Sequence, residues 1–409
     1  MNRAASDKYV RRIKTLNKRK QYEKCGAAIL ILCLALLLPG CTEAVSETLS
    51  SAAEGAMKAL TGDNTLYVDS VSEDRYAYQT LTETQQLVYD ELVYAFQNRE
   101  TDIQIATTDP EEMELAYLAV RYDYADFFWV EGLSYVTYSR NDEITAIEIT
   151  PEFGMTAEEQ EEVQAQIDAE VDRLLADAPW EGSDYEKALY VYETLISEVD
   201  YAEDAENSQN IVSAFLNHET VCQGYAYANQ YLLEQLGIAC TTVIGTVNGS
   251  ESHAWNLAVL DGAYYFIDPT WGNSQYVSSS SQDESDSEDF SYINYNYFAA
   301  TSATLETSHQ ADSRIPLPEC TATEDNYYIR EGLYIEAWDA GAIGSIISEA
   351  WNGGEEILQV KFANVELCEQ AMQFFVEDGR VFDYCSGLHS IQYLANTDNA
   401  VMVLLFVRE

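Results

Sequence analysis

The strongest constraint on the fold is a dipeptide that fixes a β-hairpin. Asp261 and Gly262 form a two-residue turn signal between two largely apolar segments, ESHAWNLAVL and AYYFI. Such a turn sets the register of both strands, because Leu260 must then face Ala263 and every other pair follows. The chain is therefore expected to contain an antiparallel sheet built around this hairpin.

The register brings a histidine and a carboxylate together at one end of the hairpin. Trp255 is expected to face Asp268, and His253 lies two residues from Trp255 on the same face. Diagonal neighbours are roughly 7–8 Å apart, which an imidazole and a carboxylate can bridge. The other side chains expected on this face are apolar, namely Leu257, Val259, Tyr264 and Phe266. We expect His253 and Asp268 to form the polar end of a buried stripe.

A cysteine stands where a helix is expected to begin. In the segment VCQGYAYANQYLLEQLGI, apolar residues recur at helical spacing and Gly237 is placed to end the helix. Cys222 then lies at or near the N-terminus, where free N–H groups and the helix dipole favour a thiolate and can stabilise an oxyanion. Gly224 is expected to let a substrate chain approach closely.

Cysteine, histidine and aspartate in this order predict a nucleophile, a base and an orienting group. Cys222 would attack an amide or ester carbonyl after His253 takes its proton, while Asp268 holds the ring. The resulting thioester would be resolved by an amine or by water. His218 is an alternative base four residues upstream of Cys222, although nothing in the sequence orients it. The ordinary alternative is a buried thiol and a core histidine.

The segments VCQGYA and ESHAWNLAVLDGAYYFIDPTWG resemble the transglutaminase-like superfamily in its bacterial extracytoplasmic form. The resemblance implies an α+β, papain-like fold in which the nucleophile helix packs on an antiparallel sheet, here with small accessory α/β domains. It gives Cys222, His253 and Asp268 the roles described above, with no cofactor and no metal. The residues expected to shape the site are Gln223, Gly224, Tyr225, Trp255, Asn256, Trp271 and, as a candidate oxyanion donor, Tyr201.

The N-terminus predicts export and attachment to a membrane. Residues 1–24 are basic, and residues 26–38 form an apolar run that is too short for a comfortable membrane span. This pattern is typical of a secretory signal. The sequence Leu-Pro-Gly-Cys that ends at Cys41 resembles a bacterial lipobox, which implies cleavage after Gly40 and a diacylglycerol on Cys41. A single-pass anchor is the alternative, and both place the body on the extracytoplasmic face of the cell membrane.

The charge of the body limits its partners. Nine of the 21 Lys and Arg residues and two of the 70 Asp and Glu residues precede Cys41, which leaves 12 basic and 68 acidic side chains. Such a surface repels nucleic acid. A protein or peptide substrate is the expected partner, and contact with cell-wall material is an open alternative.

The cysteines of the body do not follow a metal or redox pattern. The sequence has no C-x-x-C pair, so neither a zinc ribbon nor a thioredoxin-like motif is expected. Four cysteines besides Cys222 are interpreted as structural, and their pairing cannot be deduced: Cys240, Cys320, Cys368 and Cys385.

Composition and periodicity divide the chain into five segments. These are a signal peptide (1–40), a tether (41–65), an accessory α+β domain (66–150), the catalytic domain (151–325) and a small α/β domain (326–409). The expected elements include helices at 81–97, from 109, at 156–177 and at 185–199, and a hairpin at 133–150 that turns at Asn141-Asp142. The Ser- and acid-rich segment 277–289 is expected to be a mobile loop.

These observations predict a membrane-anchored surface lipoprotein that acts as a cysteine acyltransferase, peptidase or amidase on protein or peptide amides. The alternative is a catalytically inactive surface module that binds peptide or cell-wall material in the same cleft.

Overall fold

The structure is a computed structural model that describes residues 72–273, 292–396 and 399–408. The predicted signal peptide, Cys41, the tether and the segment 277–289 lie outside these ranges. None of the helices in the described ranges combines the length and apolar character that a bilayer span requires. The chain divides into two compact units, up to Gln160 and from Glu161 onward. The finer boundaries at 150 and 325 stay predictions.

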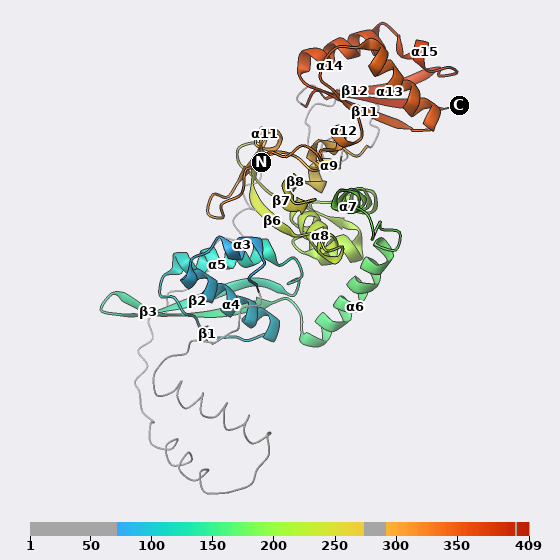
Figure 1. Cartoon of the computed structure of the whole chain (residues 1–409). Helices are drawn as coiled ribbons and strands as arrows, with labels where there is room; N and C mark the ends of the chain where they lie inside the picture. Colours follow the sequence, from blue (N-terminus) through green and yellow to red (C-terminus); the bar gives the residue numbers. More distant parts are fainter. Residues whose placement is uncertain (1–71, 274–291, 397–398, 409) are drawn as a thin grey trace, which may run out of the picture. The chain divides into compact units, whose positions relative to one another are not determined.

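The first unit combines helices with a three-stranded sheet, as the sequence predicted (Figure 1). Its main elements are α4 (Glu83–Asn98), α5 (Pro110–Asp123), β1 (Ile103–Gln104), β2 (Val130–Arg140) and β3 (Glu143–Phe153). Thr82 caps α4 in a capping box and Asp109 caps α5. Asn141 and Asp142 both have positive φ, which allows the tight turn between β2 and β3.

Helix α6 (Ala157–Leu174) crosses from the first unit into the second, and two further long helices follow it: α7 (Asp184–Glu198) and α8 (Cys222–Gln235). Helix α8 ends as predicted at Gly237, which has φ of 81°. The Gly237 N–H donates to the Glu234 carbonyl at 3.0 Å, and the Ile238 N–H donates to the Leu233 carbonyl at 3.0 Å. This paired arrangement is a Schellman motif, and its left-handed residue favours glycine.

The central sheet has the strand order β8-β7-β6-β9 and is antiparallel where its strands pair. Its strands are β6 (Cys240–Val247), β7 (Glu251–Leu260), β8 (Ala263–Ile267) and β9 (His309–Ala311). Leu260 faces Ala263 and Leu257 faces Phe266, so the predicted register is confirmed. Helices α7 and α8 lie beside this sheet (Figure 1). The result is an α+β fold with the cysteine helix packed on an antiparallel sheet.

One detail of the predicted stripe is wrong. Tyr264 is 39% exposed and Val259 is only partly buried, whereas Leu257 and Phe266 are buried. Tyr264 on the edge strand β8 and its partner Val259 on β7 lie near the turn of the hairpin, where solvent reaches them. This face of the hairpin is therefore buried only in the half that lies nearer to His253.

The C-terminal part of the second unit is a four-stranded sheet with helices. Its elements are β10 (Tyr334–Ile335), α13 (Ala340–Gly353), β11 (Ile357–Phe362), α14 (Val365–Ala371), β12 (Ser390–Asn396) and β13 (Val401–Val407). The strand order is β10-β11-β13-β12. The apolar composition of β13, VMVLLFV, is typical of a buried strand. The edge strand β12 was not predicted, because its side chains are mostly exposed and follow no alternating pattern.

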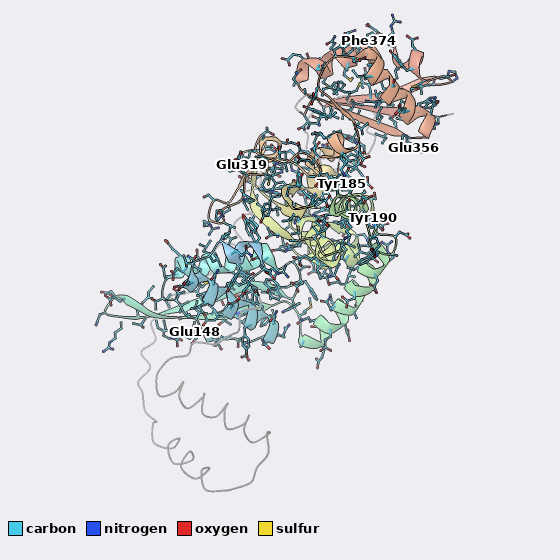
Figure 2. All side chains as sticks on the ribbon, viewed as in Figure 1. Glu148, Tyr185, Tyr190, Glu319, Glu356 and Phe374 are labelled. Atoms are coloured by element: carbon cyan, nitrogen blue, oxygen red, sulfur yellow. The ribbon has the colours of Figure 1, made fainter. Side chains whose placement is uncertain are left out.

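Hydrogen bonds join this C-terminal sheet, and the segment that leads into it, to the preceding residues of the same unit. Tyr185 of α7, labelled in Figure 2, donates its hydroxyl to Glu331 at 2.9 Å. Gln359 Nε2 donates to the Ile293 carbonyl at 2.6 Å, and Tyr328 donates to Gln359 Oε1 at 3.1 Å. Hydrogen bonds between buried or half-buried polar groups thus connect the C-terminal part of this unit to the part that precedes it.

Candidate active site

Cys222 is the first residue of α8, as the helix pattern predicted. Val221 precedes it in an extended conformation and offers no side-chain cap, so the first N–H groups of α8 are not used by the preceding side chain. Cys222 itself is partly exposed. A partly exposed sulfur at a helix N-terminus is a suitable nucleophile.

Gly224 does not admit a substrate, so the predicted reason for this glycine is wrong. A Cβ at Gly224 would lie 1.9 Å from Thr220 Oγ1 and 3.0 Å from the Ser208 carbonyl oxygen. The glycine instead allows the segment before α8 to pack against the helix. Thr220 belongs to β5 (Glu219–Thr220), which leads directly into Cys222, so this close packing fixes the start of the helix.

His253 and Asp268 lie together as the hairpin register predicted. His253 is on β7 and Asp268 directly follows β8, and His253 Nε2 lies 2.8 Å from Asp268 Oδ2. The two residues are 3% and 0% exposed. Asp268 also caps the short helix α9 (Pro269–Gly272), where its Oδ1 accepts hydrogen bonds from the N–H groups of Thr270 and Trp271.

The electrostatics favour an ionised pair. Burial opposes a charge on His253, but the Asp268 carboxylate and the hydrogen bonds that the ring makes with Asp268 and Cys222 outweigh it and raise the pKa of His253 from 6.5 to about 10. Burial also opposes a charge on Asp268, yet the imidazoles of His253 and His309 hold its pKa well below 3.8. An imidazolium beside a carboxylate is the resulting state near neutral pH.

The thiol of Cys222 completes the group. Together with Asp268, it raises the pKa of His253 through a hydrogen bond and through its charge. Because Nε2 of that ring is engaged by Asp268, the second nitrogen, Nδ1, is the atom available to the sulfur. A thiol that acts on an imidazole paired with a carboxylate can be activated and can exchange a proton with the ring.

His309 is a site residue that sequence reasoning missed. Its Nε2 lies 3.0 Å from Asp268 Oδ2 and its Nδ1 lies 2.8 Å from Ser308 Oγ. It is 41 residues from Asp268 and comes from a three-residue strand that pairs with β6, so no local pattern pointed to it. The ligating atoms of His253, Asp268 and His309 lie within 4.8 Å of one another, as in metal sites, but hydrogen bonds satisfy all three without a cation.

Aromatic rings enclose this cluster. Trp255 stacks on His253 with ring centroids 6.0 Å apart and an interplanar angle of 23°. Trp271 meets His253 edge-on at 6.2 Å and His309 at 4.8 Å. Both tryptophans were predicted to shape the site, and they separate the imidazoles from solvent. A low-dielectric wall of this kind strengthens the interactions inside it.

Asn256 connects the two elements that carry the thiol and the base. Its Nδ2 donates to the Ala226 carbonyl at 2.9 Å, and its Oδ1 accepts from Asn229 Nδ2 at 2.9 Å. Asn256 is on β7 and the two partners are on α8. The fully buried amide thus holds the strand of His253 against the helix of Cys222.

The remaining predicted residues lie around the start of α8. Gln223 is buried in its first turn. Tyr225 is buried, donates its hydroxyl to the Val199 carbonyl and accepts from Asn273 Nδ2 at 3.2 Å. Tyr201 is on β4 and pairs with Thr220, two residues before the nucleophile. Its role as an oxyanion donor stays a prediction.

His218 does not replace His253 as the base. It is half-exposed, and its Nδ1 lies 4.0 Å from a carboxylate oxygen of Glu170 on α6. The four cysteines interpreted as structural are buried thiols: Cys240, Cys320, Cys368 and Cys385.

Comparisons with known proteins agree with this core. Residues 174–269 match the profile of the transglutaminase-like superfamily, a range that contains Cys222, His253 and Asp268 but not His309. Kyphoscoliosis peptidase of Mus musculus is 23% identical over 170 residues, which cover 37% of this chain and 24% of that protein. The Homo sapiens protein is 23% identical over 180 residues, which cover 40% and 25%.

A solved structure of a TGase is 14% identical, with a TM-score of 0.26, and the match covers 49% of this chain and 62% of that one. The chain spans about a quarter of the length of the curated relatives it matches.

Proposed function

Because residues 174–269 form a transglutaminase-like core, we propose that this protein is an extracytoplasmic cysteine acyltransferase or hydrolase that acts on protein or peptide amides. Cys222 is the nucleophile, His253 the base and Asp268 the orienting group. The observation that carries the proposal is the hydrogen bond of 2.8 Å between His253 and Asp268, with the thiol of Cys222 acting on the same ring.

The proposed reaction follows from these positions. The thiolate of Cys222 attacks the substrate carbonyl, and N–H groups at the start of α8 stabilise the negative oxygen that forms. The His253 imidazolium then gives its proton to the departing amine, leaving a thioester on the sulfur. A second amine or a water loses a proton to His253, attacks the thioester and frees the sulfur.

Two parts of the proposal rest on sequence or on relatives rather than on the site. A lipid on Cys41 would hold the body at the membrane, as the lipobox-like sequence implies. The relatives are named a peptidase and a TGase, which correspond to water and an amine as the group that resolves the thioester.

Alkylation of the full-length chain tests the proposed nucleophile. Iodoacetamide at neutral pH is expected to label Cys222 at least tenfold faster than a free thiol, because the imidazolium stabilises the thiolate. His253→Ala is expected to remove this advantage. Three buried thiols serve as internal controls, since burial raises the pKa of Cys320 to about 12 and the pKa of Cys368 and Cys385 to about 11. Peptide mapping by mass spectrometry locates the label.

Labelling of Cys222 no faster than a free thiol would contradict the proposal and favour the inactive binding module. A peptide library incubated with and without a primary amine then identifies the reaction, because deamidation, cleavage and cross-linking give different mass changes. In the same preparations, fatty-acid incorporation that persists in Cys41→Ser would contradict the lipid anchor.

A further inference from the structure

His309 presents a second imidazole to the carboxylate that His253 uses. We propose that His309 is a positioning residue that shares Asp268 with His253 and thereby sets how firmly the carboxylate holds the proton of the His253 ring. The proposal rests on the proposed function of Cys222, His253 and Asp268. His309 lies outside residues 174–269, which match the superfamily profile.

Hydrogen bonding fixes the proton positions around Asp268. Oδ1 accepts the N–H groups of Thr270 at 2.9 Å and Trp271 at 3.1 Å. Oδ2 lies 2.8 Å from Nε2 of His253 and 3.0 Å from Nε2 of His309. An ionised carboxylate only accepts, and it offers about four lone-pair positions. Both imidazoles must therefore carry hydrogen on Nε2, and all four positions of Asp268 are occupied.

The ring of His309 has little freedom to leave this position. Ser308 Oγ holds its Nδ1 at 2.8 Å, and the residue is 4% exposed. Its ring centroid lies 4.8 Å from that of Trp271 and 5.1 Å from that of Trp255. Ser308 and the indole rings of Trp255 and Trp271 thus orient the ring of His309 so that its Nε2–H points to Asp268.

Sharing one oxygen has a chemical consequence. A donor on Oδ2 withdraws part of the negative charge that would otherwise stabilise the His253 imidazolium. The proposed reaction needs an imidazolium that can release its proton to the departing amine. His309 therefore keeps the His253–Asp268 pair from holding that proton too tightly.

The other groups around the cluster do not supply this effect. Cys222 on α8 acts on the ring of His253 and raises its pKa. Two tyrosines approach from other elements: the charge of Asp268 acts on Tyr192 of α7, and the ring of Tyr297 in the short helix η4 (Tyr295–Tyr297) lies 5.9 Å from that of His309. The two imidazoles are the groups that bond to Oδ2, at 2.8 Å for His253 and 3.0 Å for His309. His309 is therefore the group to change.

The test compares His309→Leu with His309→Gln, because the amide Nε2 of glutamine can occupy the place of the ring Nε2 and still donate. Both are made in full-length protein that carries Cys222→Ser, so that no thiolate acts on His253. The four histidines are labelled with ¹⁵N, and NMR follows the titration of the His253 ring. We expect its midpoint to rise by about one pH unit in His309→Leu, the size of one charge-assisted hydrogen bond, and to return towards the starting value in His309→Gln.

A midpoint that stays constant or falls in His309→Leu, or that rises as far in His309→Gln, would overturn the proposal. So would one equivalent of zinc that copurifies with the parent protein and is lost in His309→Gln, because the imidazoles would then be ligands. The NMR titration requires no activity. A failure of Cys222 alkylation in the parent protein would therefore reject the proposed function while leaving the shared carboxylate testable.

Discussion

Asp268 is fully buried yet ionised, because four N–H groups surround its two oxygens. Two of them come from backbone and two from imidazoles. The chemistry of the site at the scale of single residues therefore depends on one carboxylate and on the protons that face it. This dependence has a measurable signature in the pH dependence of folding.

The His253–Asp268 pair is expected to stabilise the fold in a defined pH window. His253 has a raised folded pKa of about 10, so its contribution is fully present below 6.5 and is lost as the pH rises through 10. Asp268 has a lowered pKa, so its contribution is present above 3.8 and is lost as the pH falls below that value. The wild-type protein should therefore exceed His253→Gln in free energy of unfolding by the largest amount between about pH 4 and 6.5.

Urea unfolding of both proteins at about pH 5, 7 and 9 measures this difference. The advantage of the wild-type chain should shrink from the first to the last of these. A difference in the free energy of unfolding that is the same at all three pH values would mean that the pKa of His253 is not raised in the folded state.

At this scale, the sequence predicted correctly the positions of those residues whose neighbours are determined by a nearby turn or by helical periodicity. The two-residue turn fixed where His253 and Asp268 meet, and the helix pattern placed Cys222 at the first position of α8. Their catalytic roles stay predictions. His309 could not be found, because its place depends on a pairing with β6 across more than 60 residues. The purpose of Gly224 was misjudged because two groups that crowd it, the Ser208 and Asn210 carbonyls, come close to it only in the folded chain.

At the scale of elements, helix α8 is defined by its two ends. Its first residue carries the thiol, and its last turn closes on Gly237. Both predicted hairpin turns are also present, and the helices predicted at 81–97 and from 109 begin at the caps Thr82 and Asp109, because caps and turns are determined by a few adjacent residues. Edge strand β12 and the π-helical turn at Ser213–Asn217 have no such local signal and were not predicted.

Gly237→Ala is expected to destabilise the protein by about 1 kcal/mol, because alanine is strained at positive φ. The free energy of unfolding in urea measures the effect. Gly353→Ala is the matched control, since Gly353 is the last residue of α13, has no positive φ, and an added Cβ would meet no atom within 4 Å. The control should be neutral or stabilise the fold by about 0.5 kcal/mol. Equal losses in the two variants would show that the left-handed conformation is not the cause.

At the scale of the whole molecule, residues 161–409 form one compact unit although the sequence predicted a boundary at 325. Gln359 alone makes two of the connections, one to the Ile293 carbonyl and one to the Tyr328 hydroxyl. Sequence periodicity identifies elements but does not reveal such side-chain bonds. Cooperative unfolding is therefore the appropriate test of how many domains this part contains.

Buried thiols provide probes at both ends of this unit. Cys240 on β6 and Cys385 near the C-terminus are buried, and each should react with a maleimide only after unfolding. We expect both to become reactive at the same urea concentration. Gln359→Leu should lower that concentration for both, at a cost of about 1–3 kcal/mol for the hydrogen bonds lost. Reaction of Cys385 at a clearly lower concentration than Cys240 would instead support an independent C-terminal domain.

Because Asp268 caps α9, substitutions of the proposed triad should differ in how much protein accumulates in the cell. Oδ1 of Asp268 holds the start of that helix while its Oδ2 serves the imidazoles. A genetic screen would therefore recover Asp268→Ala as a protein that fails to accumulate, whereas Cys222→Ser should accumulate normally and lack only reactivity. Abundance in such a screen distinguishes the one residue of the proposed triad that also belongs to the scaffold.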